Sequence, residues 1–299
     1  NPESEVTLKK SGIGAQVFNR KALKLHRDRA AEKFEQYNFL FNEVADRLID
    51  KLNDVREDFK VGLDIGCHTG QLLYCLRETD KIETLFQCDI SEKFISHAKK
   101  DAFVGDEEFL PIKDNSLDVV LSNLSLHWVN DLPGTLIQIR RTLKKDKLFL
   151  ASLFGGSTLF ELRDALITAE IEVLGGASPR VSPFIDMENA GGLLQRAGFS
   201  LPVVDTDLIS VVYENPIKLM FDLRGMGEQQ AINNCSKKFT NRNVFSRAAE
   251  IYKERYANGD GTVTATFEIL FLAAWTPSDN QQQPLKRGTG EISLAEVFK

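Results

Sequence analysis

Apolar residues recur at three- and four-residue steps in the first part of the chain, and short apolar runs replace this pattern further on. Over residues 27–52 the apolar positions form one stripe, which predicts a single amphipathic helix. Its members are Ala30, Phe34, Tyr37, Phe41, Val44, Leu48 and Leu52. Beyond it, strand-like runs alternate with helical stretches, and this order is typical of βαβ units and a parallel sheet.

Four short apolar runs predict the first strands of that sheet. They are VGLDI (61–65), TLFQCDI (84–90), LDVVLSN (117–123) and LFLASLF (148–154). Ser91 is placed to cap the helix after the second run. The expected helices are LLYCL after the first run, then 92–100, 132–144, 158–174 and 187–197. Two late strands are expected at 208–213 and 266–275.

Composition and charge narrow the class of protein. The chain has 299 residues, of which 42% are hydrophobic, enough for one large domain with additions. The net charge of -6 argues against general nucleic-acid binding, which needs a cationic surface. No run of about 18 apolar residues is present, so we expect no transmembrane segment. The four cysteines show no CxxC pair and no metal-ligand spacing, which fits a reducing compartment and no metal site.

The stretch LDIGCHTGQL, residues 63–72, resembles the loop after the first strand of a nucleotide-binding α/β domain. A dinucleotide fingerprint needs glycine at positions 66, 68 and 71, and only Gly66 is present. The alternative spacing is Asp64-x-Gly66-x-His68-x-Gly70, with the acid at the end of the strand. An acid there suits a ligand with a cationic ammonium, such as the methionine moiety of S-adenosyl-L-methionine. The two glycines let the backbone approach that ligand closely.

Acidic residues also follow the next two strands. Asp89 ends the second strand, where a carboxylate can accept both ribose hydroxyls, and Ile90 beside it can pack on the adenine. In GDEEFLP (105–111), Asp106 can accept from the adenine amino group, with Glu107 alongside. Three acidic elements after three successive strands therefore predict a site for S-adenosylmethionine.

This order of motifs resembles the class I S-adenosylmethionine-dependent methyltransferases, closely over residues 60–154. The resemblance implies an α/β fold with a seven-stranded, mostly parallel sheet and helices on both faces. We expect a helical N-terminal segment over 1–56 that forms a lid, the methyltransferase domain over 57–277 with insertions after residue 155, and a polar tail over 278–299.

His68 departs from that family, which usually has glycine in the middle of this loop. A histidine must point its ring away from the ligand or replace one of its contacts. Its protonation near neutral pH can also modulate binding. We expect a solvent-facing side chain at a tolerant position.

The stretch SNLSLHWVNDLP (122–133) follows the fourth strand, where the family usually places residues that face the acceptor. Asn123 is a further candidate for cofactor binding. His127 and Trp128 can line an acceptor pocket, with His127 as a general base. The alternative is that Trp128 fills a gap in the core and His127 bonds only to backbone.

A narrower resemblance covers nearly the whole chain. Its motifs are VFNRKALKLHRDRAA (17–31), DEEFLP, SLSLHWVNDLP, DLRGMGE (222–228) and ATFEILFLAAW. Together they resemble a methyltransferase subgroup that contains biotin-synthesis-type methyltransferases and mitochondrial complex I assembly factors, and the chain is nearer to the second set. The first set implies methylation of malonyl on an acyl carrier protein. The second implies hydroxylation of an arginine on an iron–sulfur subunit of complex I. A third hypothesis is a non-catalytic assembly protein that binds the cofactor.

Two further features bear on these alternatives. Residues 18–33 hold six Lys or Arg against two acids, which can dock an acidic carrier or a partner subunit, or can be a solvated helix face. Hydroxylation needs an oxidant, and His26 and Asp28, two apart on a helix, do not share a face that could hold iron. The residues alone therefore favour methyl transfer, and the closer resemblance keeps hydroxylation open. The same resemblance implies a bacterial cytoplasmic protein, or a eukaryotic one in the mitochondrial matrix.

Overall fold

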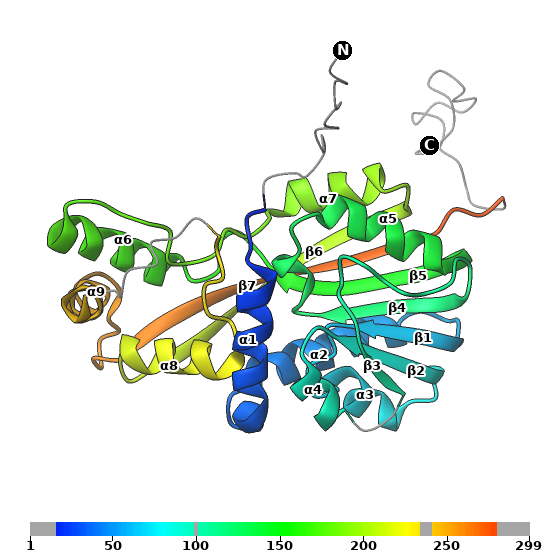
Figure 1. The fold of residues 1–299 in the computed structure, drawn as a ribbon, viewed down its shortest axis with the longest axis horizontal. Coiled ribbons are helices and arrows are strands. Elements are labelled where there is room, and N and C mark those ends of the chain that lie inside the picture. Colours follow the sequence, from blue (N-terminus) through cyan, green and yellow to red (C-terminus); the bar gives the residue numbers. More distant parts are fainter. Residues whose placement is uncertain (1–15, 99–100, 234–240, 280–299) are drawn as a thin grey trace, which may run out of the picture.

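The computed structural model of this chain describes residues 16–98, 101–233 and 241–279, and their fold is built on one seven-stranded sheet (Figure 1). The strand order is β3-β2-β1-β4-β5-β7-β6. The strands are β1 Phe59–Ile65, β2 Ile82–Asp89, β3 Ala102–Val104, β4 Leu117–Asn123, β5 Leu143–Phe154, β6 Ser200–Tyr213 and β7 Val263–Trp275. All pairings from β3 to β5 are parallel, and β7 is antiparallel to both β5 and β6. The predicted mostly parallel sheet is confirmed.

Helices lie on both faces of this sheet, as expected. The α-helices are α1 Arg20–Ala30, α2 Phe39–Asn53, α3 Gln71–Cys75, α4 Glu92–His97, α5 Leu132–Thr142, α6 Phe160–Leu174, α7 Met187–Arg196, α8 Pro216–Met226 and α9 Arg242–Tyr256. Short 3₁₀ turns are η1 Ala31–Gln36, η2 Leu76–Glu78 and η3 Leu126–Trp128. Ser91 caps α4 as predicted, because its Oγ accepts from the backbone N–H of Phe94 at 3.1 Å.

The single helix predicted over 27–52 is wrong. The chain forms α1, the 3₁₀ turn η1 and then α2, and it changes direction at Tyr37, whose φ of -128° and ψ of -1° are not helical. The apolar stripe is nevertheless buried except at Tyr37, which is half-buried, and the break lets Phe34 pack edge-on against both Phe41 and Phe94. The periodicity of apolar residues therefore indicated which side of this segment is buried, but not that the helix is interrupted.

Side chains on the two faces of β4 belong to two separate hydrophobic clusters. Val119 and Leu121 join the cluster that includes α2, α6 and α9, whereas Val120 joins the cluster on the side of α5 and α7. All seven residues of β4 are buried, which is typical of a central parallel strand. This packing fixes the carboxyl end of β4 next to that of β1.

The antiparallel pair β6–β7 extends beyond the parallel part of the sheet. β5 pairs with β7 only as far as Phe154 with Ile269, while β6 follows β7 to its first residue, Val263. Helices α6, α8 and α9 gather around this extension (Figure 1). The strand predicted at 208–213 is only the second half of β6, and α8 and α9 were not predicted.

The start of α1 is fastened to a distant segment, residues 231–233. The N–H of Asn19 donates to the carbonyl of Ala231 at 2.6 Å, and the N–H of Asn233 donates to that of Val17 at 2.8 Å. Phe18 packs edge-on against Trp128, with ring centroids 5.3 Å apart. Helix α1 is therefore held at its N-terminus by the second half of the chain.

Two expectations concern the ends and the membrane. From residue 280 on, the polar tail predicted over 278–299 lies outside the described residues. Within the described ranges, no helix combines the length and the apolarity that a membrane crossing requires.

Candidate functional site

The predicted acidic residues meet at one edge of the sheet. β1 lies between β2 and β4, so the strand order reverses there, and in open α/β sheets ligands bind outside the carboxyl ends of the strands at such a switch point. The structure brings Asp64 of β1, Asp89 at the end of β2, and Asp106 and Glu107 after β3 to this edge. Which of them contact a ligand remains a prediction.

The loop after β1 turns sharply, with positive φ at Gly66 (70°), His68 (51°) and Gly70 (89°). A Cβ on Gly66 would lie 1.9 Å from Ser125 Oγ, so no larger residue fits there. The N–H groups of Gly66 and Cys67 both donate to the carbonyl of Cys88, at 2.7 and 3.0 Å. The loop is thereby tied to the end of β2.

His68 does not face solvent, and that prediction is wrong. The residue is 1% exposed. Its ring is parallel to that of Phe34 at 5.6 Å and also contacts Phe41 and Phe94. Burial, and secondly the charge of Arg27, lower the pKa of His68 well below its usual range, so the ring is neutral near neutral pH. A change in its protonation near neutral pH is therefore not expected.

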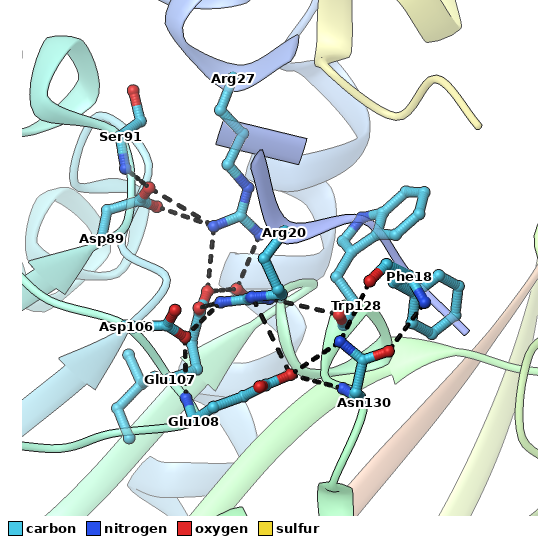
Figure 2. Close-up of polar contacts among 12 residues, drawn as sticks. Phe18, Arg20, Arg27, Asp89, Ser91, Asp106, Glu107, Glu108, Trp128 and Asn130 are labelled. Atoms are coloured by element: carbon cyan, nitrogen blue, oxygen red, sulfur yellow. Dashed lines mark hydrogen bonds and ion pairs between the residues drawn. The ribbon is translucent and has the colours of Figure 1, made fainter. Parts of the chain in front are cut away.

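Arg27 of α1 occupies the carboxylate cluster, as Figure 2 shows. Its side chain is 1% exposed. Nη1 lies 3.3 Å from Asp89 Oδ2 and 3.0 Å from Glu107 Oε1, and Nη2 donates to Ser125 Oγ at 2.9 Å. Asp89 also accepts from the backbone N–H groups of His68 and Ser91. The side chain that the cofactor's ribose would need is thus already fully bonded.

Arg20, seven residues earlier on α1, binds the neighbouring acids. It forms ion pairs with Asp106 at 2.6 Å and with Glu107, and it donates to the carbonyl of Trp128 at 3.2 Å (Figure 2). Sequence analysis counted Arg20 and Arg27 only as part of a basic segment. In the structure these two are neither a solvated face nor a docking surface, because they neutralise carboxylates of the same chain.

The two buried carboxylates, Glu107 and Asp89, have different numbers of arginine partners. Burial acts to raise the pKa of Glu107, but Arg20 and Arg27 outweigh it and hold that pKa at about 2. Asp89 has only Arg27, and burial together with the charge of Glu107 raises the pKa of Asp89. The charged form of Glu107 is therefore stabilised more strongly than that of Asp89.

Asp64 is the least satisfied carboxyl of the site. It is 1% exposed, and neither of its oxygens has a hydrogen-bond partner among the described residues. Burial, and secondly the charge of Asp89, raise the pKa of Asp64 well above its usual range. A buried carboxyl without partners is costly unless a ligand supplies them, so this group fits a bound cation.

The other two cofactor candidates lie nearby with different surroundings. Ile90 is buried next to Asp89. The amide of Asn123 donates to the carbonyl of Phe41 at 2.9 Å and accepts from Ser152 Oγ at 2.8 Å. Asn123 therefore links β4 to α2 and β5 with both of its amide groups.

A cavity of about 270 Å³ lies beside the carboxylate cluster, under α6, α8 and α9. Its wall is mainly apolar and aromatic, with Trp128, Phe154, Phe184, Leu162, Leu166, Met220, Phe245 and Phe267 among its residues. The polar groups in the wall include His26, Arg180, Ser182 and Glu228. Arg180 is bonded to Glu170 through Nε at 2.7 Å.

His127 and Trp128 both bind Glu228, a residue that the sequence analysis quoted only within the DLRGMGE motif. Trp128 Nε1 donates to Glu228 Oε2 at 2.9 Å, and His127 Nε2 lies 3.1 Å from the same oxygen. His127 Nδ1 is buried, with no partner in the described part of the chain. Trp128 and Glu228 line the cavity, whereas His127 is not among its lining residues and packs its ring against Phe154 and Phe184.

The described ranges contain no group of three or more His, Cys, Asp or Glu that is placed to hold a metal ion.

Comparison with known proteins gives three kinds of match. A model described as "Methyltransferase domain" matches residues 63–151. "Arginine-hydroxylase NDUFAF5, mitochondrial" of Danio rerio is 40% identical over 296 residues, which are 96% of this chain and 91% of that protein. The Homo sapiens protein of that name is 40% identical over 293 residues, 95% of this chain and 84% of that protein.

"Malonyl-[acyl-carrier protein] O-methyltransferase" of Xylella fastidiosa is 32% identical over 268 residues, 87% of this chain and 88% of that protein. Among solved structures, a putative methyltransferase from Bacillus halodurans has a TM-score of 0.54 and 14% identity, covering 78% of this chain and 99% of that one. Phosphoethanolamine N-methyltransferase 2 of Haemonchus contortus, in complex with S-adenosyl-L-methionine, has a TM-score of 0.54 and 15% identity, covering 90% and 61%. At these sequence identities the solved structures show similarity of fold alone.

Proposed function

This chain belongs to the family that contains the NDUFAF5 arginine-hydroxylases and the malonyl-[acyl-carrier protein] O-methyltransferases, and from that premise we propose that it binds S-adenosylmethionine and modifies an arginine side chain of a protein partner. The match to the methyltransferase domain supports binding of S-adenosylmethionine. The identity is 40% to the NDUFAF5 proteins and 32% to the O-methyltransferase, and this difference supports arginine as the acceptor.

The observation that carries the cofactor assignment is the unsatisfied carboxyl of Asp64. An ammonium group, such as that of the methionine moiety, would supply the missing partner for a buried acid at this strand end. Asp89 would accept the ribose hydroxyls, and Asp106 and Glu107 would bind the adenine amino group. Glycine at position 66 lets the loop pack against Ser125, because a side chain there would collide with that residue.

Arg27 must leave the cluster before the cofactor binds in this way. Its guanidinium and the ribose hydroxyls would use the same oxygens of Asp89. Cofactor binding is therefore coupled to a movement of Arg27, and the lid proposed for residues 1–56 includes helix α1. The methyltransferase domain would extend over 57–277, with the tail beyond it.

The residues of this chain mainly bind, orient and exclude water. S-adenosylmethionine supplies an activated methyl group when bound. The apolar wall under α6, α8 and α9 would hold the acceptor side chain, and alignment of the reacting groups accounts for much of the rate in such transfers. Little acid–base machinery is required of the protein.

Isothermal titration with S-adenosylmethionine and S-adenosylhomocysteine tests the cofactor assignment. We expect micromolar binding to the wild type and no detectable binding to Asp89→Asn. Asp54→Asn, which changes an exposed acid, is the matched control and should bind like the wild type. Unchanged affinity in Asp89→Asn would refute the site.

Mass spectrometry of the acceptor distinguishes the reactions. The acceptor is an arginine-bearing iron–sulfur subunit, incubated in air with S-adenosylmethionine and a reductant. A gain of one methylene indicates methyl transfer, and a gain of one oxygen atom, taken from dioxygen at the expense of the reductant, indicates hydroxylation. No gain, with cofactor still bound, supports the non-catalytic assembly protein.

Carboxyl methylation of malonyl on an acyl carrier protein is the second candidate. The O-methyltransferase relative supports it. Malonyl carrier protein belongs in the same mass-spectrometric screen. The mitochondrial names of the relatives support a location in the mitochondrial matrix for a eukaryotic source, and the bacterial relative supports the cytoplasm for a bacterial one.

A further inference from the structure

Glu228 is the carboxylate in the wall of the cavity as far as the described residues define that wall. Its side chain is only 6% exposed. Trp128 and His127 both approach its Oε2, and Oε1 has no partner among the described residues. Because a carboxylate oxygen only accepts, the proton in the contact with His127 sits on Nε2.

Two other buried acids in this part of the molecule, Glu170 and Glu107, have arginine partners. Glu170 is bonded to Arg180, and Glu107 is bonded to Arg20 and Arg27. In the described ranges Glu228 has no direct ion pair with lysine or arginine, and the charge of Arg27 acts on it only from beyond contact distance. A buried carboxylate without a cation is unfavourable, because the charge loses its hydration without a full electrostatic return. Glu228 is therefore poised to gain from a cation that enters the cavity.

The surroundings of Glu228 suit one kind of cation. The wall carries the rings of Trp128, Phe154 and Phe184, and aromatic faces attract a guanidinium more readily than a compact, strongly hydrated ammonium. A malonyl carboxylate would instead meet a like charge at Glu228. Shape and charge together favour a flat cation on a flexible, partly apolar stem.

We propose that Glu228 is the specificity-determining residue of this cavity, and that its carboxylate receives the guanidinium of the acceptor arginine. His127 and Trp128 are positioning residues, which hold Glu228 Oε2 and leave Oε1 for the acceptor. This assignment differs from that of His127 as a general base, because Nε2 of His127 is bonded to Glu228 and His127 is not among the residues that line the cavity. The inference rests on the proposed function, since it concerns the acceptor half of the same site.

Binding of a small probe tests this role without requiring turnover. The full chain, saturated with S-adenosylhomocysteine, is titrated with N-acetyl-arginine methylamide and with the citrulline analogue, which has nearly the same shape and no charge. We expect the wild type to bind the arginine probe at least about tenfold more tightly, as for a charge-assisted contact. Glu228→Gln should abolish this preference and leave the affinity for S-adenosylhomocysteine unchanged.

Three variants make the result specific. Glu228→Asp keeps the charge and should retain a reduced preference for arginine, which provides a second measurement if Glu228→Gln does not fold. His127→Asn should weaken the preference without abolishing it. Glu83→Gln changes an exposed acid and should behave like the wild type.

The outcomes separate the two proposals. Equal binding of both probes by the wild type, a preference that persists in Glu228→Gln, or tighter binding of malonate than of the arginine probe would overturn the role of Glu228. Failure of the wild type to bind S-adenosylhomocysteine would instead overturn the proposed function.

Discussion

Replacement of Arg27 by methionine should affect stability and cofactor affinity in opposite directions. Methionine keeps an unbranched apolar stem in the buried position and removes the guanidinium that binds Asp89, Glu107 and Ser125. Removing one partner of a buried ion pair typically costs about 3–5 kcal/mol, because the remaining charge is left without compensation. We expect the free energy of unfolding to fall by about this amount.

Cofactor affinity should rise in the same variant. In the wild type the cofactor must first separate Arg27 from Asp89, and that cost is subtracted from the binding free energy. If separation costs about 3 kcal/mol, its removal tightens the binding of S-adenosylhomocysteine about 100-fold, since each 1.4 kcal/mol is a factor of ten. The increase is smaller where Asp89 and Glu107 take up protons once the cation is gone.

Two measurements check this prediction. Urea denaturation, followed by tryptophan fluorescence, gives the loss of stability, and isothermal titration gives the affinity. Arg29→Met removes an exposed cation from the same helix and should change neither quantity. A lower affinity in Arg27→Met would mean that Arg27 contacts the bound cofactor, and the reasoning from displacement would then be wrong.

Three further predictions concern titrating and buried groups. Because the pKa of Asp64 is raised, an ammonium ligand must displace its proton, so the affinity for S-adenosylmethionine should rise with pH through that pKa. Calorimetry in buffers of different ionisation enthalpy measures the proton release. Asp64→Asn should lose this pH dependence. The pKa of Glu107 is about 2 in the folded protein and about 4.3 in the unfolded chain. Its contribution to the free energy of unfolding is therefore complete above about pH 4.3 and disappears as the pH falls to about 2. Acid denaturation of Glu107→Gln should lack this loss of stability, and a loss equal to that of the wild type would contradict the assignment. His68→Gly removes the ring packed on Phe34, Phe41 and Phe94 and should lower the free energy of unfolding, measured in urea, by about 2 kcal/mol. The relief of a positive φ at this position offsets part of the loss. A more stable variant would show that backbone strain outweighs packing.

The centre of the sheet could be predicted from sequence because β1, β4 and the second half of β5 are short apolar runs that are largely buried. LDVVLSN coincides with β4, and Ser91 caps α4 as its position indicated. Helix α8 was not predicted, although Asn215 and Pro216 mark its start and Gly227 its end.

The site was harder to predict than the fold, because its contacts join residues that are distant along the chain. Arg27 lies 62 residues from Asp89 and 80 from Glu107, and no local pattern reports such a pairing. His68 was expected at the surface because the loop alone offers no apolar partner; its partners come from η1, α2 and α4. Glu228 was quoted in a motif, but its role depends on His127 and Trp128, about 100 residues earlier.

The fastening of α1 has a consequence for the order of events on the ribosome. The side chain of Asn233 donates to the carbonyl of Phe18, 215 residues away, so this contact waits until most of the chain has been synthesised. The strands from β1 to β5 emerge well before it, and long-range contacts of this kind form late because closing a large loop costs entropy. Until then Arg27 can already meet Asp89 and Glu107, but the N-terminus of α1 lacks its anchor. The final fixing of α1 over the carboxylate cluster therefore follows synthesis of the segment around Asn233.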